Sequence, residues 1–539
     1  MTALQAVPQT IKHLKGVISN LHAKYKDGYD ELQQTVVALQ EEVRRLLAEN
    51  ERLAEDLNSA KKWEKQAALV PELKSTINSL TKQLAVAKKE NEKNKEQLAA
   101  LRDQMKKSSE TSDKPQSTNI FKKPVSRKTK SGKKQGGQQG HEGHTLRQLP
   151  EPDTIIPRYP DETCDCGGKV QLNGGYTNKQ MVDIKITLNV IEERALSGYC
   201  DKCGKRHVGS FTECFVNPVS YGNDLKALVA FLNTRMNLPV NKVTELLRVL
   251  TDSQIRMSDG SVVNIVDELA KKSAPTLETI KAALIRCGLL LADETGCRIN
   301  GSLEWFQILT NDQFLLLSHN KKRGSLLFEG TDILLLFSGI LVHDHFMSYY
   351  RYEHLLHGEC NEHIDRRLKA VNEILQHEWA KELRSFFFEA DKRKKELMDA
   401  GEFFSEQEKE DYFRRFLEIL DRGDAEYHNA IDGKETILRY NEERCLLKRL
   451  REYAEEHLRF IANPIVPRGN NGAERGAKEA KRKVRVSGGF RSDKGADNYA
   501  RVTSVIGTMK KNDMDVIQGL KDIFNNETLL FNFQNSEPG

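Results

Sequence analysis

The sequence predicts a multidomain α/β protein, in which helical segments precede and interrupt a strand-rich core. The chain has 539 residues, too many for one compact core, and roughly 150 residues per domain gives three or four units. Residues 30–105 carry a heptad pattern, whereas short apolar runs separated by turn residues gather between residues 289 and 344. Hydrophobic residues make up 38% and charged residues 30%, which fits a coiled coil beside a globular part.

Charge and cysteine content narrow the class of protein further. The net charge of +5 is modest, but bases gather at residues 122–134 and 475–485, which favours local contacts with nucleic acid. Nine cysteines, four of them in two close pairs, favour metal binding in a reducing compartment over a disulfide framework. No apolar stretch reaches membrane-spanning length, and the N-terminus lacks a signal pattern. We therefore expect a soluble cytoplasmic protein without membrane contact.

After an N-terminal segment (residues 1–29), residues 30–105 are predicted to form a coiled coil. Apolar residues there alternate by four and three, the spacing of a supercoiled seam: Leu32, Val36, Leu39, Val43, Leu46, Leu53, Leu57 and Ala60. Asn50 occupies one seam position and favours an in-register homodimer, because its amide is satisfied opposite a like partner. Pro71 interrupts the pattern. A long amphipathic helix packed on its own domain is the alternative.

Residues 106–150 are rich in Ser, Lys, Gly and Gln and are predicted to form a basic linker. A group of bases without an intervening acid lies within it: Lys122, Lys123, Arg127, Lys128, Lys130, Lys133 and Lys134. Such a tract can neutralise several phosphates and bind DNA without sequence preference. A linker that only keeps the chain soluble would have the same composition.

Two close cysteine pairs, each followed by glycine, mark residues 151–215 as a zinc-binding module: Cys164 with Cys166, and Cys200 with Cys203. Four thiolates arranged in two turns can hold one structural Zn²⁺ tetrahedrally. The first pair has one intervening residue where two are usual, so His207 or Cys214 could replace one of its thiolates. Four cysteines that are merely buried are the alternative.

Residues 216–283 are predicted to be helical. A turn at 252–257 leads to Ser258, which is expected to cap the next helix. Helix, short turn and capped helix form the outline of a helix-turn-helix, whose second helix could enter the major groove of DNA. Any helical bundle has the same outline.

Two aspartates end apolar runs in the predicted first part of the core, residues 284–352. Asp293 closes the run from Gly288, and Asp344 closes the run from Gly339. Carboxylates that end buried strands are costly unless they are paired or bind a cation. A meander followed by a crossover would place both on neighbouring strands. Together with Glu474, in a helix-forming segment, they could hold two Mg²⁺ ions for in-line attack at a phosphodiester.

Residues 353–459 are charged and poor in Gly and Pro, which predicts a helical insertion before the core resumes over residues 460–523 and ends in a tail, 524–539. Near the start of the insertion, histidine or cysteine recurs at every third position: His354, His357, Cys360 and His363. A second zinc is conceivable there, although a helix would spread these four around more than half a turn.

Four ordered blocks in residues 130 to 520 resemble DDE transposases of the insertion sequence 66 (IS66) family. The blocks are Asp293-Glu-Thr-Gly-Cys-Arg, Asp344 followed by Tyr349, Asn470-Asn-Gly-Ala-Glu474-Arg475, and the Gly/His-rich stretch 136–146. The resemblance implies a ribonuclease H-like core, a mixed sheet with helices, interrupted by the helical insertion. It also implies that Asp293 is the ligand shared by both Mg²⁺ ions, with Asp344 and Glu474 completing one each. Cys360 and His363 resemble a Cys-x-x-His element of the family, expected to orient the entry into the insertion.

The segment after Glu474 is strongly basic, with one acid among six bases: Arg475, Lys478, Lys481, Arg482, Lys483 and Arg485. We expect these side chains to lie against the DNA backbone beside the metals. The alternative for the basic segment is an exposed, charged helix without a ligand. The alternative for Glu474 is an ion pair with Lys478 on the helix surface.

The sequence therefore predicts a transposase that binds double-stranded DNA at element ends, cuts it and joins it to target DNA. The homodimer would hold two ends together. The resemblance implies helper proteins encoded by the same element, and a bacterial cytoplasm in which the protein associates with the nucleoid when bound to DNA. Two alternatives remain: a non-catalytic coiled-coil zinc DNA-binding regulator, and a hydrolytic nuclease with the same metal ligands.

Overall fold

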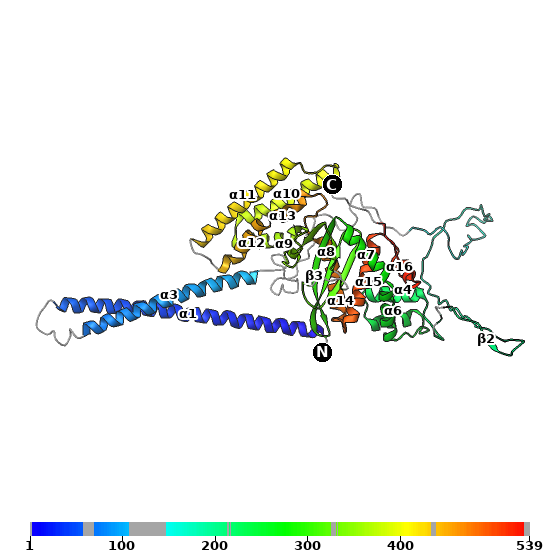
Figure 1. Cartoon of the computed structure of the whole chain (residues 1–539), viewed down its shortest axis with the longest axis horizontal. Helices are drawn as coiled ribbons and strands as arrows, with labels where there is room; N and C mark the ends of the chain where they lie inside the picture. Colours follow the sequence, from blue (N-terminus) through cyan, green and yellow to red (C-terminus); the bar gives the residue numbers. More distant parts are fainter. Residues whose placement is uncertain are drawn as a thin grey trace.

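The computed structural model describes residues 3–57, 69–106, 147–212, 215, 217–324, 330, 332–432 and 438–532. Two long helices extend from one side of a central body, which contains a β-sheet and the helices that cover it (Figure 1). Residues 147–212 extend from the opposite side of that body (Figure 1). The basic tract at 122–134, the Gly/His-rich stretch and Cys214 lie outside the described residues.

The two long helices, α1 (Ala3–Leu57) and α3 (Leu69–Lys106), pack against each other. On α1, the predicted seam residues Val36 and Leu46 are 8% and 5% exposed. The side chains of Asn50, Leu53 and Leu57, and all of Ala60, lie outside the described residues. The helices were predicted to pair with a second chain, whereas α1 packs on α3 of its own chain. The homodimer stays a prediction.

A mixed sheet lies at the centre of the body, and the α/β class is confirmed. Its strands are β3 (Leu289–Ile299), β4 (Ser302–Thr310), β5 (Leu315–Asn320), β6 (Ile340–His343) and β7 (Leu356–Glu359), in the order β5-β4-β3-β6-β7. The meander β3–β5 is antiparallel, and β6 and β7 run parallel to β3. Asn300 and Gly301 turn β3 into β4 with positive φ angles of 45° and 83°, as a two-residue hairpin requires.

Two boundaries differ from the prediction. Asp293 was expected to close its strand, but β3 continues to Ile299 because residues 294–299 pair with β4. The insertion was expected to begin at residue 353, but β7 extends the sheet to Glu359. β7 is only four residues long, so its sequence carries no clear alternation of apolar and polar positions.

The two faces of the sheet belong to separate cores. Leu291, Ile308 and Val342 point toward the face that packs against α14 (Asn471–Ser487) and the insertion. Leu290, Ala292, Leu309 and Leu341 point the other way, into the core that includes α7 (Ala274–Arg286) and α15 (Asp493–Lys511). Successive side chains of a strand alternate between faces, so each strand supplies both cores.

Helix α15 also covers the edge of the sheet. The hydroxyl of Ser504 accepts a hydrogen bond of 2.8 Å from the backbone N–H of Leu317, and Thr508 accepts one of 3.1 Å from that of Leu315. These bonds satisfy donors of β5 that would otherwise invite pairing with another chain.

The predicted insertion is mainly helical after β7. It contains α9 (Asn361–Ala370), α10 (Glu378–Asp399), α11 (Glu406–Ile431), α12 (Asn441–Glu452) and α13 (Ala454–Ala462). Its interior is aromatic, with Trp379, Phe386 and Phe416 fully buried. Helix α3 reaches the insertion, where Asp103 forms an ion pair with Arg439. The long hairpin is thereby joined to the body.

The helices before the sheet are α4 (Asn223–Thr234), α5 (Val240–Leu250) and α6 (Asp259–Lys272). Ser258 caps α6 as predicted, accepting a hydrogen bond of 3.1 Å from the N–H of Ser261. Helix α6 packs on α4, α15 and α16 (Val516–Phe524), burying Val262 and Leu269. Its apolar face is therefore not available to DNA, and groove binding by its other face stays a prediction.

Among the residues placed in the structure, none of the helices is both long and apolar enough to cross a membrane.

Candidate metal centre

Asp293 lies within β3, and Asp344 directly follows the last residue of the neighbouring parallel strand β6. The pairing of β3 with β6 aligns Leu291 with Val342, and each aspartate follows two residues later. Because side chains alternate along a strand, Asp293 belongs to the face that bears Leu291 and Val342. Asp344 lies close enough for its charge to add to the effect of burial on the pKa of Asp293. Helix α14 packs on that face. The sheet therefore places Asp293 toward the helix that carries Glu474.

Two glycines let α14 approach the sheet. A Cβ atom at Gly472 would lie 2.5 Å from Cδ1 of Leu291, and one at Gly476 would lie 3.0 Å from Cγ2 of Ile308. A side chain at Gly472 would therefore push the start of the helix away from β3. Glu474 lies between these two glycines in the first turn, so their small size sets its distance from Asp293.

Asn470 fixes the start of α14 in a way that the sequence did not indicate. The residue is 1% exposed, and its side-chain amide donates a hydrogen bond of 2.5 Å to the carbonyl of Ala292. Asparagine is a common capping residue at the start of a helix. Asn470 does occupy the cap position, but its side chain makes no capping bond, and Asn471 is the exposed first helical residue.

The carboxylates influence one another. Burial, followed by the negative charges of Asp344 and Glu474, raises the pKa of Asp293 to about 7. Burial also raises the pKa of Asp344, against the opposing effect of His363 and Arg323. A buried carboxylate beside other acids is stabilised by a divalent cation, so this donor set fits Mg²⁺.

Glu474 has more basic surroundings. Burial raises its pKa, but the hydrogen bond and charge of Lys478, together with His363 and Arg366, outweigh burial and lower it overall. Lys478 Nζ lies 2.9 Å from Oε2 of Glu474, so the surface ion pair considered as an alternative does form. The same carboxylate also lies close enough to Asp293 for its charge to act on that residue.

Glu294 follows Asp293 on β3, so its side chain lies on the opposite face of the sheet. Its carboxylate accepts hydrogen bonds of 3.0 Å from Arg323 Nε and 3.2 Å from Gln307. The guanidinium of Arg323 lies over the rings of Trp305 and Phe346, 4.9 and 4.2 Å from their centroids. Sequence reasoning missed Arg323, although the basic run Lys321-Lys322-Arg323 directly follows a strand.

Glu359 is a second buried acid that sequence reasoning missed. It ends β7, and its carboxylate bonds His345 Nδ1 at 2.5 Å, the hydroxyl of Tyr350 at 2.7 Å and Arg449 at 2.6 Å. Burial raises its pKa, but His345 and the nearby positive groups outweigh burial and lower it strongly. Because His345 follows Asp344, this network ties the loop after β6 to the insertion helix α12.

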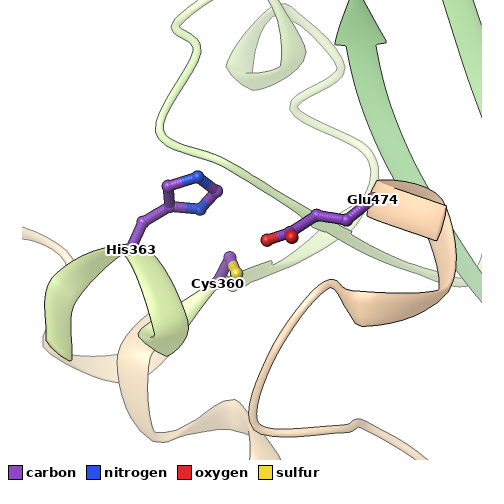
Figure 2. A group of neighbouring side chains, drawn as sticks. All are labelled: Cys360, His363 and Glu474. Atoms are coloured by element: carbon purple, nitrogen blue, oxygen red, sulfur yellow. The ribbon is translucent and has the colours of Figure 1, made fainter. Parts of the chain in front are cut away.

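Three potential metal ligands converge beside the aspartates. Sγ of Cys360, a ring nitrogen of His363 and a carboxylate oxygen of Glu474 all lie within 4.8 Å of one another. Figure 2 shows Cys360 and His363 at the start of α9, facing Glu474 from α14. Among the described residues this is the one group of three or more such side chains gathered this closely, so Asp293, Asp344 and Glu474 are spaced more widely.

The four-residue zinc arrangement considered near the insertion does not form. His354 lies 3.1 Å from the carbonyls of Leu334 and Phe337 through Nε2, and His357 lies 3.0 Å from His343. His354 precedes β7 and His357 lies within it, so neither histidine belongs to α9.

The cysteine pairs of residues 151–215 each form a tight turn. Gly167 and Gly204 adopt positive φ angles of 85° and 71° after the second cysteine of each pair. Backbone N–H groups lower the pKa of both Cys166 and Cys200, at Gly168 and at Cys203 respectively. Strands β1 (Ser197–Tyr199) and β2 (Arg206–Val208) flank the second turn.

The described residues do not gather the two cysteine pairs into one cluster. No group of three or more ligands within 4.8 Å includes Cys164, Cys166, Cys200 or Cys203, and these thiols are exposed or half-buried. The zinc site with four thiolates stays a prediction, as does His207 as a substitute ligand.

The basic residues of α14 do not all face solvent. Arg475, Lys478, Lys481, Arg482 and Arg485 are exposed. Lys483 was predicted to contact DNA, but it is 7% exposed and donates a hydrogen bond of 2.6 Å to the carbonyl of Asn233. Burial lowers its pKa to about 8. The helical period turns Lys483 toward the body. The prediction that Lys483 contacts DNA is therefore wrong, because its amine bonds within the protein.

Comparison with known proteins gives two family matches. Residues 218–498, more than half of the chain, match the model of the family described as "Transposase IS66 family". Residues 24–147 match a family of unknown function (DUF6444). None of the curated proteins matches the chain.

Proposed function

Because the chain belongs to the IS66 family of transposases, we propose that it cuts DNA strands at the ends of an insertion sequence and joins them to target DNA. The observation that carries this proposal is the placement of Asp293, Asp344 and Glu474. Support comes from the pairing of β3 with β6, from the packing of α14 on the sheet, and from Asp293, whose pKa is raised first by burial and then by the charges of Asp344 and Glu474.

The order of the strands supports a ribonuclease H-like core. An antiparallel meander of β3, β4 and β5, extended on the other side by the parallel strands β6 and β7, is the mixed sheet that the family resemblance implies. In this reading the acids lie on the central strand, directly after the next parallel strand and on the helix that crosses them. The helical insertion separates the second acid from the third.

Asp293, Asp344 and Glu474 would hold two Mg²⁺ ions, with Asp293 as the shared ligand. Bound Mg²⁺ would act as a Lewis acid, activating the attacking oxygen and stabilising the leaving 3′-oxygen. Around these acids the chain supplies fixed positive charge. Burial raises the pKa of Asp344, and the charges of His363 and Arg323 oppose that rise, so both groups lie where they could also attract a phosphate.

DNA would follow the exposed side of α14. Arg475, Lys481 and Arg482 are exposed on the helix that carries Glu474, so a duplex held by these bases would pass beside the acids. Such contacts position the backbone without reading its sequence. The predicted basic tract at 122–134 would add further phosphate contacts. The predicted zinc module, homodimer and helper proteins belong to the same proposal.

The test is cleavage and joining of end-labelled DNA with Mg²⁺. We expect Asp293→Asn, Asp344→Asn and Glu474→Gln each to lower the rate by about 1000-fold while DNA binding persists. Asp312→Asn, an exposed aspartate in the turn between β4 and β5, is the matched control. Cutting that survives all three substitutions would show that other groups perform the chemistry.

The products separate the alternatives. Joined strands identify a transposase, whereas cut strands that are never joined identify a hydrolytic nuclease with the same ligands. A protein that binds DNA but neither cuts nor joins it, even with helper proteins added, would be the non-catalytic regulator.

A further inference from the structure

Glu474 belongs to two groups of side chains. On one side its charge adds to burial and to the charge of Asp344 in raising the pKa of Asp293. On the other side it lies with Cys360 and His363, whose ligand atoms are within 4.8 Å of its own (Figure 2). The second group supplies sulfur, nitrogen and oxygen from three side chains.

The backbone holds Cys360 in this position from two directions. Its N–H donates a hydrogen bond of 2.9 Å to the carbonyl of His343, the residue before Asp344. Its Sγ accepts a bond of 3.2 Å from the N–H of Asn470, at the start of α14. The thiol is thereby fixed between the end of β6 and the helix that carries Glu474, and it is fully buried.

His363 lies on the same side as the acids. A ring nitrogen of His363 lies within 4.8 Å of a carboxylate oxygen of Glu474, and the charge of His363 opposes the rise that burial causes in the pKa of Asp344. Cys360 immediately precedes α9 and His363 lies in its first turn, three positions later. On a helix this spacing directs two side chains to one face. The pair therefore faces α14 as a unit.

The donor set favours one class of metal. Thiolate and imidazole with one carboxylate suit Zn²⁺, whereas Mg²⁺ requires oxygen ligands. Three protein ligands leave one position open to water, as in a zinc site that can exchange its ion. We propose that Cys360, His363 and Glu474 bind Zn²⁺ and that this ion competes with the Mg²⁺ centre for Glu474.

Binding of Zn²⁺ at this site requires Cys360 to lose its thiol proton. Burial raises the pKa of Cys360 to about 12, with a smaller contribution from the charge of Glu474. The bound state needs the thiolate, so Zn²⁺ displaces a proton and binds more tightly as pH rises. The site is occupied only when free Zn²⁺ or a similar thiol-binding ion is present. The effect of bound Zn²⁺ on DNA cleavage rests on the proposed function.

Metal binding can be measured without DNA, using Co²⁺ as a spectroscopic substitute for Zn²⁺. The full-length chain with Cys164→Ser and Cys200→Ser serves as the parent, because those changes disable the predicted four-thiolate site. We expect about one equivalent of Co²⁺ with a sulfur-to-metal absorption band. Adding Cys360→Ser or His363→Gln should abolish the band or weaken binding by at least about 100-fold.

Cys287→Ser is the matched control, since Cys287 is another buried cysteine, at the end of α7. It should keep the Co²⁺ band, which separates loss of a ligand from loss of a buried thiol. Having two ligand variants also guards against one that fails to fold, with thermal melting as the check. A band that persists in both Cys360→Ser and His363→Gln, or a parent without any band, would overturn the proposal.

Competition is tested next, by adding Zn²⁺ to the Mg²⁺-dependent cleavage reaction. Each variant is compared with its own rate in the absence of Zn²⁺. We expect Zn²⁺ to inhibit the unaltered chain, and Cys360→Ser to require at least about tenfold more Zn²⁺ for the same inhibition. Equal inhibition of both would refute competition at Glu474. If the protein cuts no DNA at all, the proposed function fails while the Co²⁺ result still decides the metal site.

Discussion

The side-chain amide of Asn470 donates a hydrogen bond to the carbonyl of Ala292, the residue before Asp293. The backbone N–H of the same asparagine donates to Sγ of Cys360. Asn470 therefore joins β3, α9 and α14 at the point where each contributes a polar group to the candidate centre. Its position between the two proposed metal-binding groups makes it a support for both.

Asn470→Ala should weaken that junction. The carbonyl of Ala292 would lose its side-chain partner in a buried position, which costs about 1–3 kcal/mol. We expect a lower urea midpoint and a slower Mg²⁺-dependent cleavage rate, because α14 would no longer hold Glu474 at a fixed distance from Asp293. Asn471→Ala, at the exposed neighbouring position, is the control and should change neither value. Equal effects of both substitutions would show that the bond to Ala292 is unimportant.

The raised pKa of Asp293 predicts a pH-dependent stability when no metal is present. The pKa is about 7 in the folded protein against an ordinary value of 3.8 for an aspartate, so the folded state keeps a proton that the unfolded chain releases. The retained proton therefore stabilises the folded state below about pH 3.8, and this stabilisation declines as pH rises from there and is lost above about 7. The shift corresponds to an effect on the order of a few kcal/mol.

Urea unfolding with a chelator, measured across this pH window, tests the effect. Asp293→Asn should flatten the decline in stability, because the amide has no proton to lose. Mg²⁺ should restore stability near neutral pH in the parent and not in Asp293→Asn. A parent whose stability is flat across the window would contradict the assigned shift.

The elements that depend on local pattern were predictable. Apolar runs indicated the meander, Ser258 indicated the start of α6, and the runs before Asp293 and Asp344 indicated neighbouring strands. The length of β3 was missed because residues 294–299, Glu-Thr-Gly-Cys-Arg-Ile, form no apolar run, and their strand is defined by pairing with β4. The polar run around Glu294 gave no sign of that partner.

Contacts between distant residues were not predictable. Glu359 and Arg449 lie 90 positions apart, and no local spacing relates them. The heptads on α1 indicated a helical partner but could not tell a second chain from α3, because both cover the same seam. Lys483 was read as one of six equivalent bases, whereas its place on the helix turns it inward.

Arg482 and Lys483 should therefore behave differently, although they are neighbours. Arg482 is exposed, so Arg482→Ala should weaken DNA binding at all sequences and reduce the salt dependence of the affinity by about one unit of slope. Lys483→Ala should instead lower the melting temperature, because the carbonyl of Asn233 loses its buried donor. Affinity measured over a salt series, with melting curves, distinguishes the two. A salt slope reduced by Lys483→Ala alone would restore the original assignment.

The hairpin of α1 and α3 has both buried and exposed apolar residues. Val36 and Leu46 are buried, whereas the adjacent Val37 and Leu47 are exposed. The buried pair is covered within one chain, where α3 packs on α1. The exposed pair leaves apolar surface from which the proposed homodimer could form, since burying such surface between two hairpins would be favourable.

Lysine at the exposed pair should therefore separate assembly from folding. We expect Val37→Lys with Leu47→Lys to dissociate the dimer in sedimentation velocity while the helical circular dichroism signal is kept. Val36→Lys with Leu46→Lys is the matched comparison and should reduce the helical signal, because charge in the seam opens the hairpin itself. Removal of residues 1–106 should leave a monomer. A dimer that survives this deletion would mean that assembly uses the body and not the long helices.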